Sequence, residues 1–163
     1  KLASLCIKQD AKEFFVIDGD FAVLNAQRVL NYFPKGKMIL VIRDPRDILA
    51  TVRNGLGNFM PDNFKDNLEW QLAIYRRWKK SLETTSKNQV MVVYFEDLVK
   101  NYDQQIREIF SFLNIDQSLH NKQKEVFDPK VSIKNIGLWK HLLSSEEAKL
   151  IEQKFEGLYD RFN

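Results

Sequence analysis

Hydrophobic positions recur with two different spacings along this chain, and segments of the two kinds alternate. Short apolar runs predict strands at 13–17, 38–42 and 90–94. Apolar residues spaced by three or four positions predict helices over about 22–33, 45–53, 67–86 and 106–113, with a last one after Ser144. Strands that alternate with helices favour one α/β domain over residues 1–163, with a parallel sheet flanked by helices.

Individual residues predict where these helices begin and end. Asp44 suits an N-cap, and Pro45 suits the first helical position because the N–H that proline lacks would have no partner there. Asn114 suits a C-cap, and Ser144 with Glu147 fits a capping box. The residues expected to face the core are Trp70, Ile74, Trp78, Leu82, Ile106, Ile109, Phe110, Leu113, Ala148, Ile151 and Phe155.

The segment from Met38 to Thr51 combines a strand, an arginine and a helix start. Its apolar run fits a strand buried on both faces, and Arg43 would lie at the carboxyl end, where open α/β sheets bind ligands beside helix N-termini. Thr51 follows Asp47 by four residues, so both share one helix face. A guanidinium and a hydroxyl can bind one phosphate group. Alternatively, Arg43 pairs with Asp44 or Asp47, and the pattern leaves both interpretations open.

A resemblance to a known family favours phosphate. Arg-Asp-Pro-Arg-Asp at 43–47, with a hydroxyl residue eight positions after Arg43, resembles the 3′-phosphate-binding motif of sulfotransferases that use 3′-phosphoadenosine 5′-phosphosulfate (PAPS). The resemblance implies that Arg43 and Thr51 hold the 3′-phosphate. Lys134 occupies the place of a basic residue in the family's late loop, which contacts the same phosphate; a solvated surface lysine is the alternative. Further segments resemble the family in the same order, at 90–98, 109–115 and 132–140.

The resemblance implies an enzyme that transfers a sulfuryl group from PAPS to a hydroxyl or amine. The acceptor would be a small molecule or a glycan, the product nucleotide adenosine 3′,5′-bisphosphate, and no metal would enter the chemical step. The family's first strand and Gly-rich phosphosulfate loop have no counterpart in this sequence. We therefore expect a truncated form with an incomplete P-loop-like sheet, which an upstream segment or a partner subunit would complete.

Two other functions stay open. A degenerate, non-catalytic sulfotransferase-like module would bind nucleotide or another protein, and a kinase-like transferase would prefer ATP with Mg²⁺. The catalytic group is the weakest point of the resemblance, because Asp18 stands where many bacterial members have a lysine. Asp18 would serve as the base if burial raised its pKa, or it has only a turn and N-cap role.

Composition narrows the partners further. The net charge of +3 is small and scattered, so we expect no nucleic-acid partner. No apolar run approaches the ~20 residues that cross a membrane, so we expect no membrane segment in this piece. Cys6 is the only cysteine, which excludes an internal disulfide and a cysteine-based zinc site and favours a reducing, cytoplasmic location.

Overall fold

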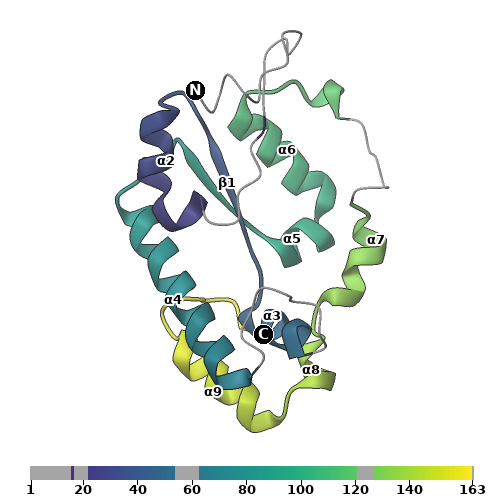
Figure 1. The fold of residues 1–163 in the computed structure, drawn as a ribbon. Helices are drawn as coiled ribbons and strands as arrows, with labels where there is room; N and C mark the ends of the chain where they lie inside the picture. Colours follow the sequence, from purple (N-terminus) through teal and green to yellow (C-terminus); the bar gives the residue numbers. More distant parts are fainter. Residues whose placement is uncertain (1–15, 17–21, 54–62, 121–126, 163) are drawn as a thin grey trace.

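The computed structural model describes residue 16 and residues 22–53, 63–120 and 127–162 (Figure 1). Within these ranges the elements are η1 Ala22–Asn25, α2 Ala26–Tyr32, β1 Met38–Ile42, α3 Pro45–Arg53, α4 Phe64–Glu83, β2 Val90–Tyr94, α5 Phe95–Lys100, α6 Tyr102–Leu113, η2 Gln117–Leu119, α7 Pro129–Ser132, η3 Ile133–Asn135, α8 Trp139–Leu142 and α9 Ser145–Phe155. The strand and helix pattern of an α/β domain is confirmed.

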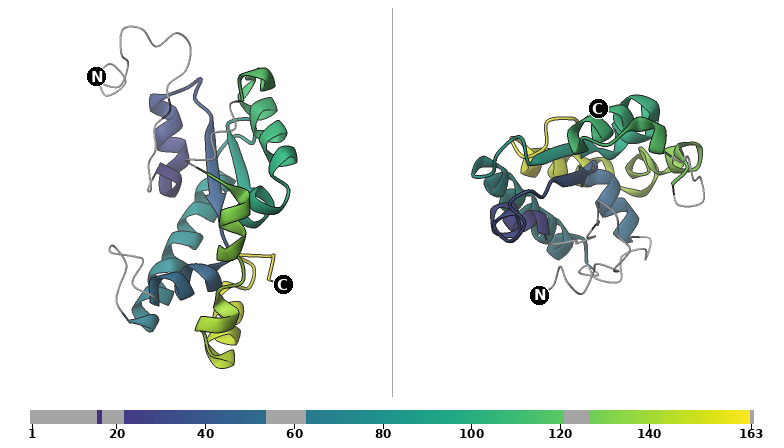
Figure 2. Two further views of the ribbon diagram at one scale, coloured as in Figure 1. Left: turned by 90° about the vertical axis from the view of Figure 1, so that its right-hand side faces the viewer. Right: turned by 90° about the horizontal axis from the view of Figure 1, so that it is seen from above.

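The sheet of the described residues consists of two parallel strands. β1 pairs with β2 in continuous register, from Met38 opposite Val90 to Ile42 opposite Tyr94. In both ribbon figures the paired strands lie between α2 and α6 (Figures 1 and 2). The two strands therefore end at the same edge, where α3 and α5 begin.

The core forms where β1, α3, α4 and α9 meet. Leu72, Ile151 and Phe155 are fully buried there, and the ring of Tyr75 meets the ring of Phe155 edge-on with 5.0 Å between centroids. The predicted capping box of α9 is present, with Ser144 and Glu147 bonding each other's backbone N–H groups. Packing of α4 and α9 against β1 thus fixes the position of the carboxyl end of the strand.

Burial differs from the sequence-based expectation at three places. Val41 is 51% exposed, so the prediction that the strand is buried on both faces is wrong; Leu40 and Ile42 face the core, and the pleat places Val41 on the opposite face. Trp78 is buried, whereas Trp70 is only half-buried. The apolar residues of α6 are likewise half-buried rather than in the core.

Helix boundaries are close to those expected. α4 begins at Phe64, three residues before the predicted start, because the side chain of Asn63 accepts a hydrogen bond from the Asp66 N–H and caps the helix. Asn114 adopts a left-handed conformation at φ 59° and caps α6 as predicted. The expected strand at 13–17 falls on residues outside the described ranges, apart from Val16, which is exposed.

Two hydrogen bonds from other elements fix the junction between β1 and α3. The Tyr75 hydroxyl donates to the Arg43 carbonyl at 2.6 Å, and the Glu96 carboxylate accepts from the Asp44 N–H at 2.9 Å. Asp44 itself caps α3, because its carboxylate accepts from the Arg46 N–H at 2.8 Å. The chain therefore leaves the strand and enters the helix in one defined direction.

Arg46 attaches the C-terminal part of the chain to this junction. It is 2% exposed and forms ion pairs with Asp44, at 2.7 Å, and with Glu152 of α9. Its guanidinium carbon lies 4.0 Å from the ring centroid of Trp139 and 4.9 Å from that of Phe162. Cation–π contacts of a desolvated arginine are stabilising, so the start of α8 and the chain after α9 are held against α3.

Replacing Glu96 by glutamine should change how stability depends on pH. Burial, followed by the nearby Asp44 and Asp47 charges, raises the pKa of Glu96, so ionising this carboxyl costs free energy in the folded state. The contribution of Glu96 to stability is therefore lost as pH rises through its folded pKa. Glutamine keeps an acceptor but cannot ionise, so Glu96→Gln should gain stability relative to wild type as pH rises above the ordinary glutamate pKa of about 4.3.

Urea denaturation at pH values below and above this pKa measures the difference between the two unfolding free energies. Glu69→Gln serves as the control, because Glu69 is an exposed partner of Lys154. Parallel pH profiles for wild type and Glu96→Gln would contradict the expectation.

Candidate functional site

Arg43 directly follows β1, and α3 begins two residues later. The side chain thus lies at the carboxyl end of the strand beside a helix start, as the sequence predicts. α8 packs against α3 at this same end of β1. The segment 132–140, here called the late loop, therefore approaches the junction (Figure 1). Residues from the middle and the end of the chain therefore meet there.

The structure brings Arg43 and Thr51 together. Nη1 of Arg43 lies 3.5 Å from Oγ1 of Thr51, a long hydrogen bond, and the Thr51 hydroxyl donates to the Asp47 carbonyl at 2.7 Å. The Arg43 guanidinium carbon lies 5.3 Å from the ring centroid of Phe95, the first residue of α5. The predicted pair of a guanidinium and a hydroxyl is therefore present at the end of the strand.

The late loop reaches the same arginine through its backbone. Nη2 of Arg43 donates to the carbonyl of Asn135, which ends η3. Lys134 is the preceding residue and is exposed. The structure thus places the loop that carries Lys134 beside Arg43. The residue of this loop that bonds to Arg43 is Asn135.

Asp44 and Asp47, the two carboxylates that the sequence offered as ion-pair partners of Arg43, bind other groups in the structure. Asp44 pairs with Arg46, and Asp47 accepts backbone N–H groups. Among the residues that the structure describes, no carboxylate forms an ion pair with Arg43, and its buried Nε has no hydrogen-bond partner. Within the described ranges, the charge of this guanidinium is therefore not neutralised by an ion pair.

Asp47 holds the late loop against α3. Its carboxylate is 1% exposed and accepts from the N–H of Gly137 at 2.7 Å and from the N–H of Trp139 at 3.0 Å. Gly137 adopts φ +79°, a left-handed conformation that favours glycine. Trp139 thus anchors the loop, with its backbone on Asp47 and its ring on Arg46.

Sequence reasoning missed this role of Asp47, as well as the roles of Arg46 and Glu96. The two N–H groups that bond to Asp47, and the Glu152 partner of Arg46, lie 90 to 106 residues later in the chain, so helical spacing carries no signal of them. The sequence feature that could have revealed these roles is the run of charged residues directly after an apolar strand, because charges placed near a core need partners.

Neither histidine of the described residues bonds to Arg43 or Thr51. Asp18, the candidate base, lies outside the described residues. His120 is half-buried beside the rings of Tyr102 and Phe110, and His141 is exposed. Within the described ranges, no group of three or more His, Cys, Asp or Glu residues is placed to hold a metal ion.

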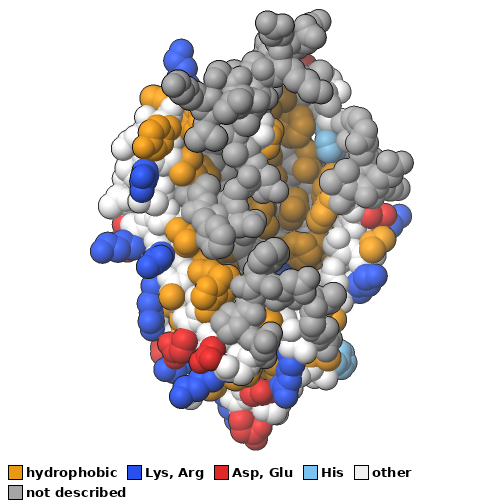
Figure 3. Space-filling model, viewed as in Figure 1, with side chains coloured by type: hydrophobic (Ala, Val, Ile, Leu, Met, Phe, Trp, Pro, Cys, Tyr) orange, Lys and Arg blue, Asp and Glu red, His pale blue; other side chains and the backbone are white. Residues whose placement is uncertain are grey.

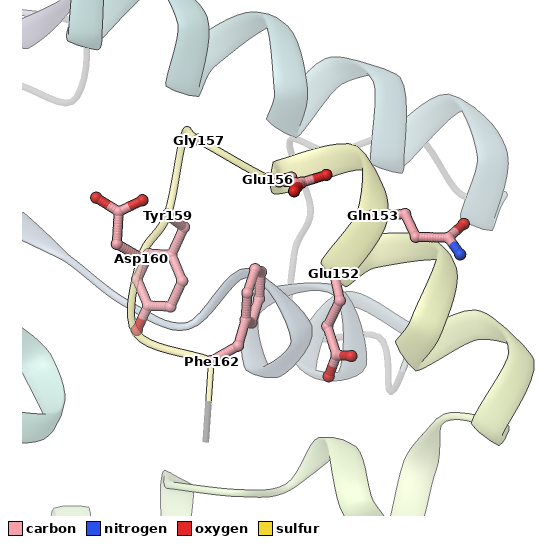
Figure 4. A pocket seen from close by; sticks show the side chains of 7 residues that line it. All are labelled: Glu152, Gln153, Glu156, Gly157, Tyr159, Asp160 and Phe162. Carbon is pink, nitrogen blue, oxygen red and sulfur yellow. The ribbon is translucent and has the colours of Figure 1, made fainter.

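A shallow hollow of about 430 Å³ lies elsewhere, at the end of α9 and the segment after it (Figure 4). Its lining residues are Glu152, Gln153, Glu156, Gly157, Tyr159, Asp160 and Phe162. Because this set includes three carboxylates and no lysine or arginine, the hollow does not suit an anionic nucleotide. The junction at Arg43 remains the candidate site.

On the face shown in Figure 3, lysine and arginine side chains are scattered around the edge rather than gathered in one patch. The described lysines and arginines visible in this view thus form no single basic patch. None of the helices in the described part of the chain is long and apolar enough to cross a membrane.

Comparisons with known proteins bear on the family and on the fold. The family model described as the sulfotransferase family matches residues 7–118. The structure is similar to that of a sulfotransferase domain from the curacin biosynthetic pathway, with a TM-score of 0.56 and 15% sequence identity. That match covers 90% of this chain, which spans 63% of the other chain's length, and at this identity it supports the fold alone. No curated protein sequence matches the chain. Because the family model covers well over half of the 163 residues, the chain belongs to the sulfotransferase family.

Proposed function

We propose that the intact protein transfers a sulfuryl group from PAPS to a hydroxyl or amine, and that Arg43, Thr51 and Lys134 bind the 3′-phosphate of the nucleotide. Family membership supports sulfuryl transfer. The single observation that supports the phosphate site is the pairing of Arg43 with Thr51 at the end of β1, without a carboxylate on Arg43 among the described residues.

The donors at this site suit a phosphate group. In the structure Arg43 donates to two neutral acceptors, the Thr51 hydroxyl and the Asn135 carbonyl, and its Nε has no acceptor. A phosphate is a stronger acceptor than either, because its negative charge attracts the guanidinium and its oxygens can accept two parallel N–H bonds from the planar fork. Exchanging the neutral acceptors for phosphate oxygens would therefore favour binding.

Each residue has a distinct role in this proposal. The planar fork of Arg43 holds two phosphate oxygens, and the Thr51 hydroxyl turns its proton from the Asp47 carbonyl to the phosphate. Lys134 supplies a further positive charge from the late loop. PAPS brings the sulfuryl group, and a small molecule or a glycan is the proposed acceptor. Asp18 remains the candidate base for the proton of the acceptor.

Replacing Arg43 by alanine tests the site. We expect wild type to bind adenosine 3′,5′-bisphosphate more tightly than adenosine 5′-phosphate in calorimetry. Arg43→Ala should lower affinity for the bisphosphate by about 10- to 100-fold, because hydrogen bonds to charged groups contribute about 1.5–3 kcal/mol. Its affinity for the monophosphate should change little.

Arg53→Ala is the matched control for this measurement. Arg53 lies at the other end of α3, where it is exposed and pairs with Glu147. Equal affinity of wild type for the two nucleotides would rule out a dedicated 3′-phosphate site.

Two substitutions of Thr51 separate its hydroxyl from its packing. Valine keeps the shape but removes the hydroxyl, so Thr51→Val should weaken binding of the bisphosphate by about 2- to 10-fold. Thr51→Ser keeps the hydroxyl and should bind nearly as wild type does. If Thr51→Val bound the bisphosphate as tightly as wild type in calorimetry, the hydroxyl would make no contribution to binding.

Lys134→Gln tests the charge of the late loop. We expect an approximately 3- to 10-fold weaker affinity for the bisphosphate at low salt, and a smaller difference from wild type at high salt, because salt screens an exposed charge. Titrations at two ionic strengths measure this. Lys130→Gln in α7 is the control, since Lys130 is also exposed. Identical losses in the two variants would indicate only a general effect of net charge.

A further inference from the structure

The late loop contacts the 43–51 segment at two points. Near its start, the Asn135 carbonyl accepts from Arg43. Near its end, the N–H groups of Gly137 and Trp139 donate to the Asp47 carboxylate. One short loop is therefore fixed to the β1–α3 junction and to the first turn of α3, through a carbonyl and two N–H groups.

Asp47 also contacts the proposed phosphate site through its own backbone. Its carbonyl accepts from the hydroxyl of Thr51, one turn further along α3. One residue thus joins the hydroxyl of the site to the loop that carries Lys134. A buried carboxylate that accepts two backbone N–H groups forms charge-assisted bonds, which are the strong ones in proteins.

We propose that Asp47 is a positioning residue, which fixes the late loop so that Lys134 can reach a phosphate bound by Arg43 and Thr51. This role rests on the proposed function. It differs from a purely structural role in one respect. A structural residue would weaken all binding alike, whereas a positioning residue controls the contribution of Lys134 alone.

A double-mutant cycle on the intact protein measures that contribution. Asp47→Asn keeps the shape but turns an amide NH₂ toward one of the loop N–H groups. We expect Lys134→Gln to lower affinity for adenosine 3′,5′-bisphosphate by about 3- to 10-fold in wild type and by less than about 2-fold in Asp47→Asn. Asp66→Asn, an exposed aspartate in the first turn of α4, is the matched control background.

Hydrogen exchange provides a readout that needs no nucleotide. In Asp47→Asn the amides of Gly137 and Trp139 should exchange about tenfold or more faster than in wild type, while the amides of α9 remain protected. If Asp47→Asn does not fold, Gly137→Ala perturbs the same loop from the other side, since its φ of +79° disfavours alanine. We expect the same loss of the Lys134 contribution in that variant.

The outcomes are distinguishable. If the affinity losses of Asp47→Asn and Lys134→Gln were additive, or if hydrogen exchange at Gly137 and Trp139 were unchanged in Asp47→Asn, the positioning role would be wrong. The proposed function would still stand, provided that wild type prefers the bisphosphate. Equal affinity of wild type for adenosine 3′,5′-bisphosphate and adenosine 5′-phosphate would overturn the proposed function and this role with it.

Discussion

Burial of three charged side chains in and before the first turn of α3 constrains everything around it. Asp44, Arg46 and Asp47 are 6%, 2% and 1% exposed. A charge removed from water destabilises a fold unless other groups pair with it or bond to it. Here the groups are supplied by α9 and by the loop before α8. The end of the chain therefore has a fixed place relative to the strand β1.

The same pairing explains why Arg43 has no ion-pair partner among the described residues, although two aspartates lie within four positions of it. Asp44 and Arg46 neutralise each other, and two backbone N–H groups stabilise Asp47. Arg43 is left with neutral acceptors, in a position where its fork can meet a ligand. Without Arg46, the Asp44 carboxylate next to it would lack its cation and would compete for Arg43. By pairing with Asp44, Arg46 thus prevents an ion pair between Asp44 and Arg43.

Local signals predicted local structure well. The apolar runs at 38–42 and 90–94 have the bounds of β1 and β2, and the N-cap at Asp44 is present. The strand bounds and the cap depend on neighbouring residues, whose conformational preferences are readable in the sequence. The pairing of Arg43 with Thr51 was implied by the family resemblance rather than by helical spacing, because Arg43 precedes α3.

Long-range features could not be predicted in this way. The exposure of Val41 depends on what packs on each face of the sheet, and strand propensity contains no such information. The start of α4 was predicted three residues too late, because the prediction followed the apolar spacing and did not consider Asn63 as the N-cap. The loop contacts of Asp47 join residues that no periodicity relates, since they depend on where β1 and α9 come to lie.

The distance along the chain between these partners also has a consequence for the order of folding. Glu152 comes 106 residues after Arg46, and the two amides come 90 and 92 residues after Asp47. A growing chain on the ribosome makes α3 long before it makes these groups, so the first turn must stay hydrated in the meantime. Contacts of such large sequence separation form late because loop closure costs entropy first. Ligand binding at Arg43 would thus report that the last third of the chain has docked.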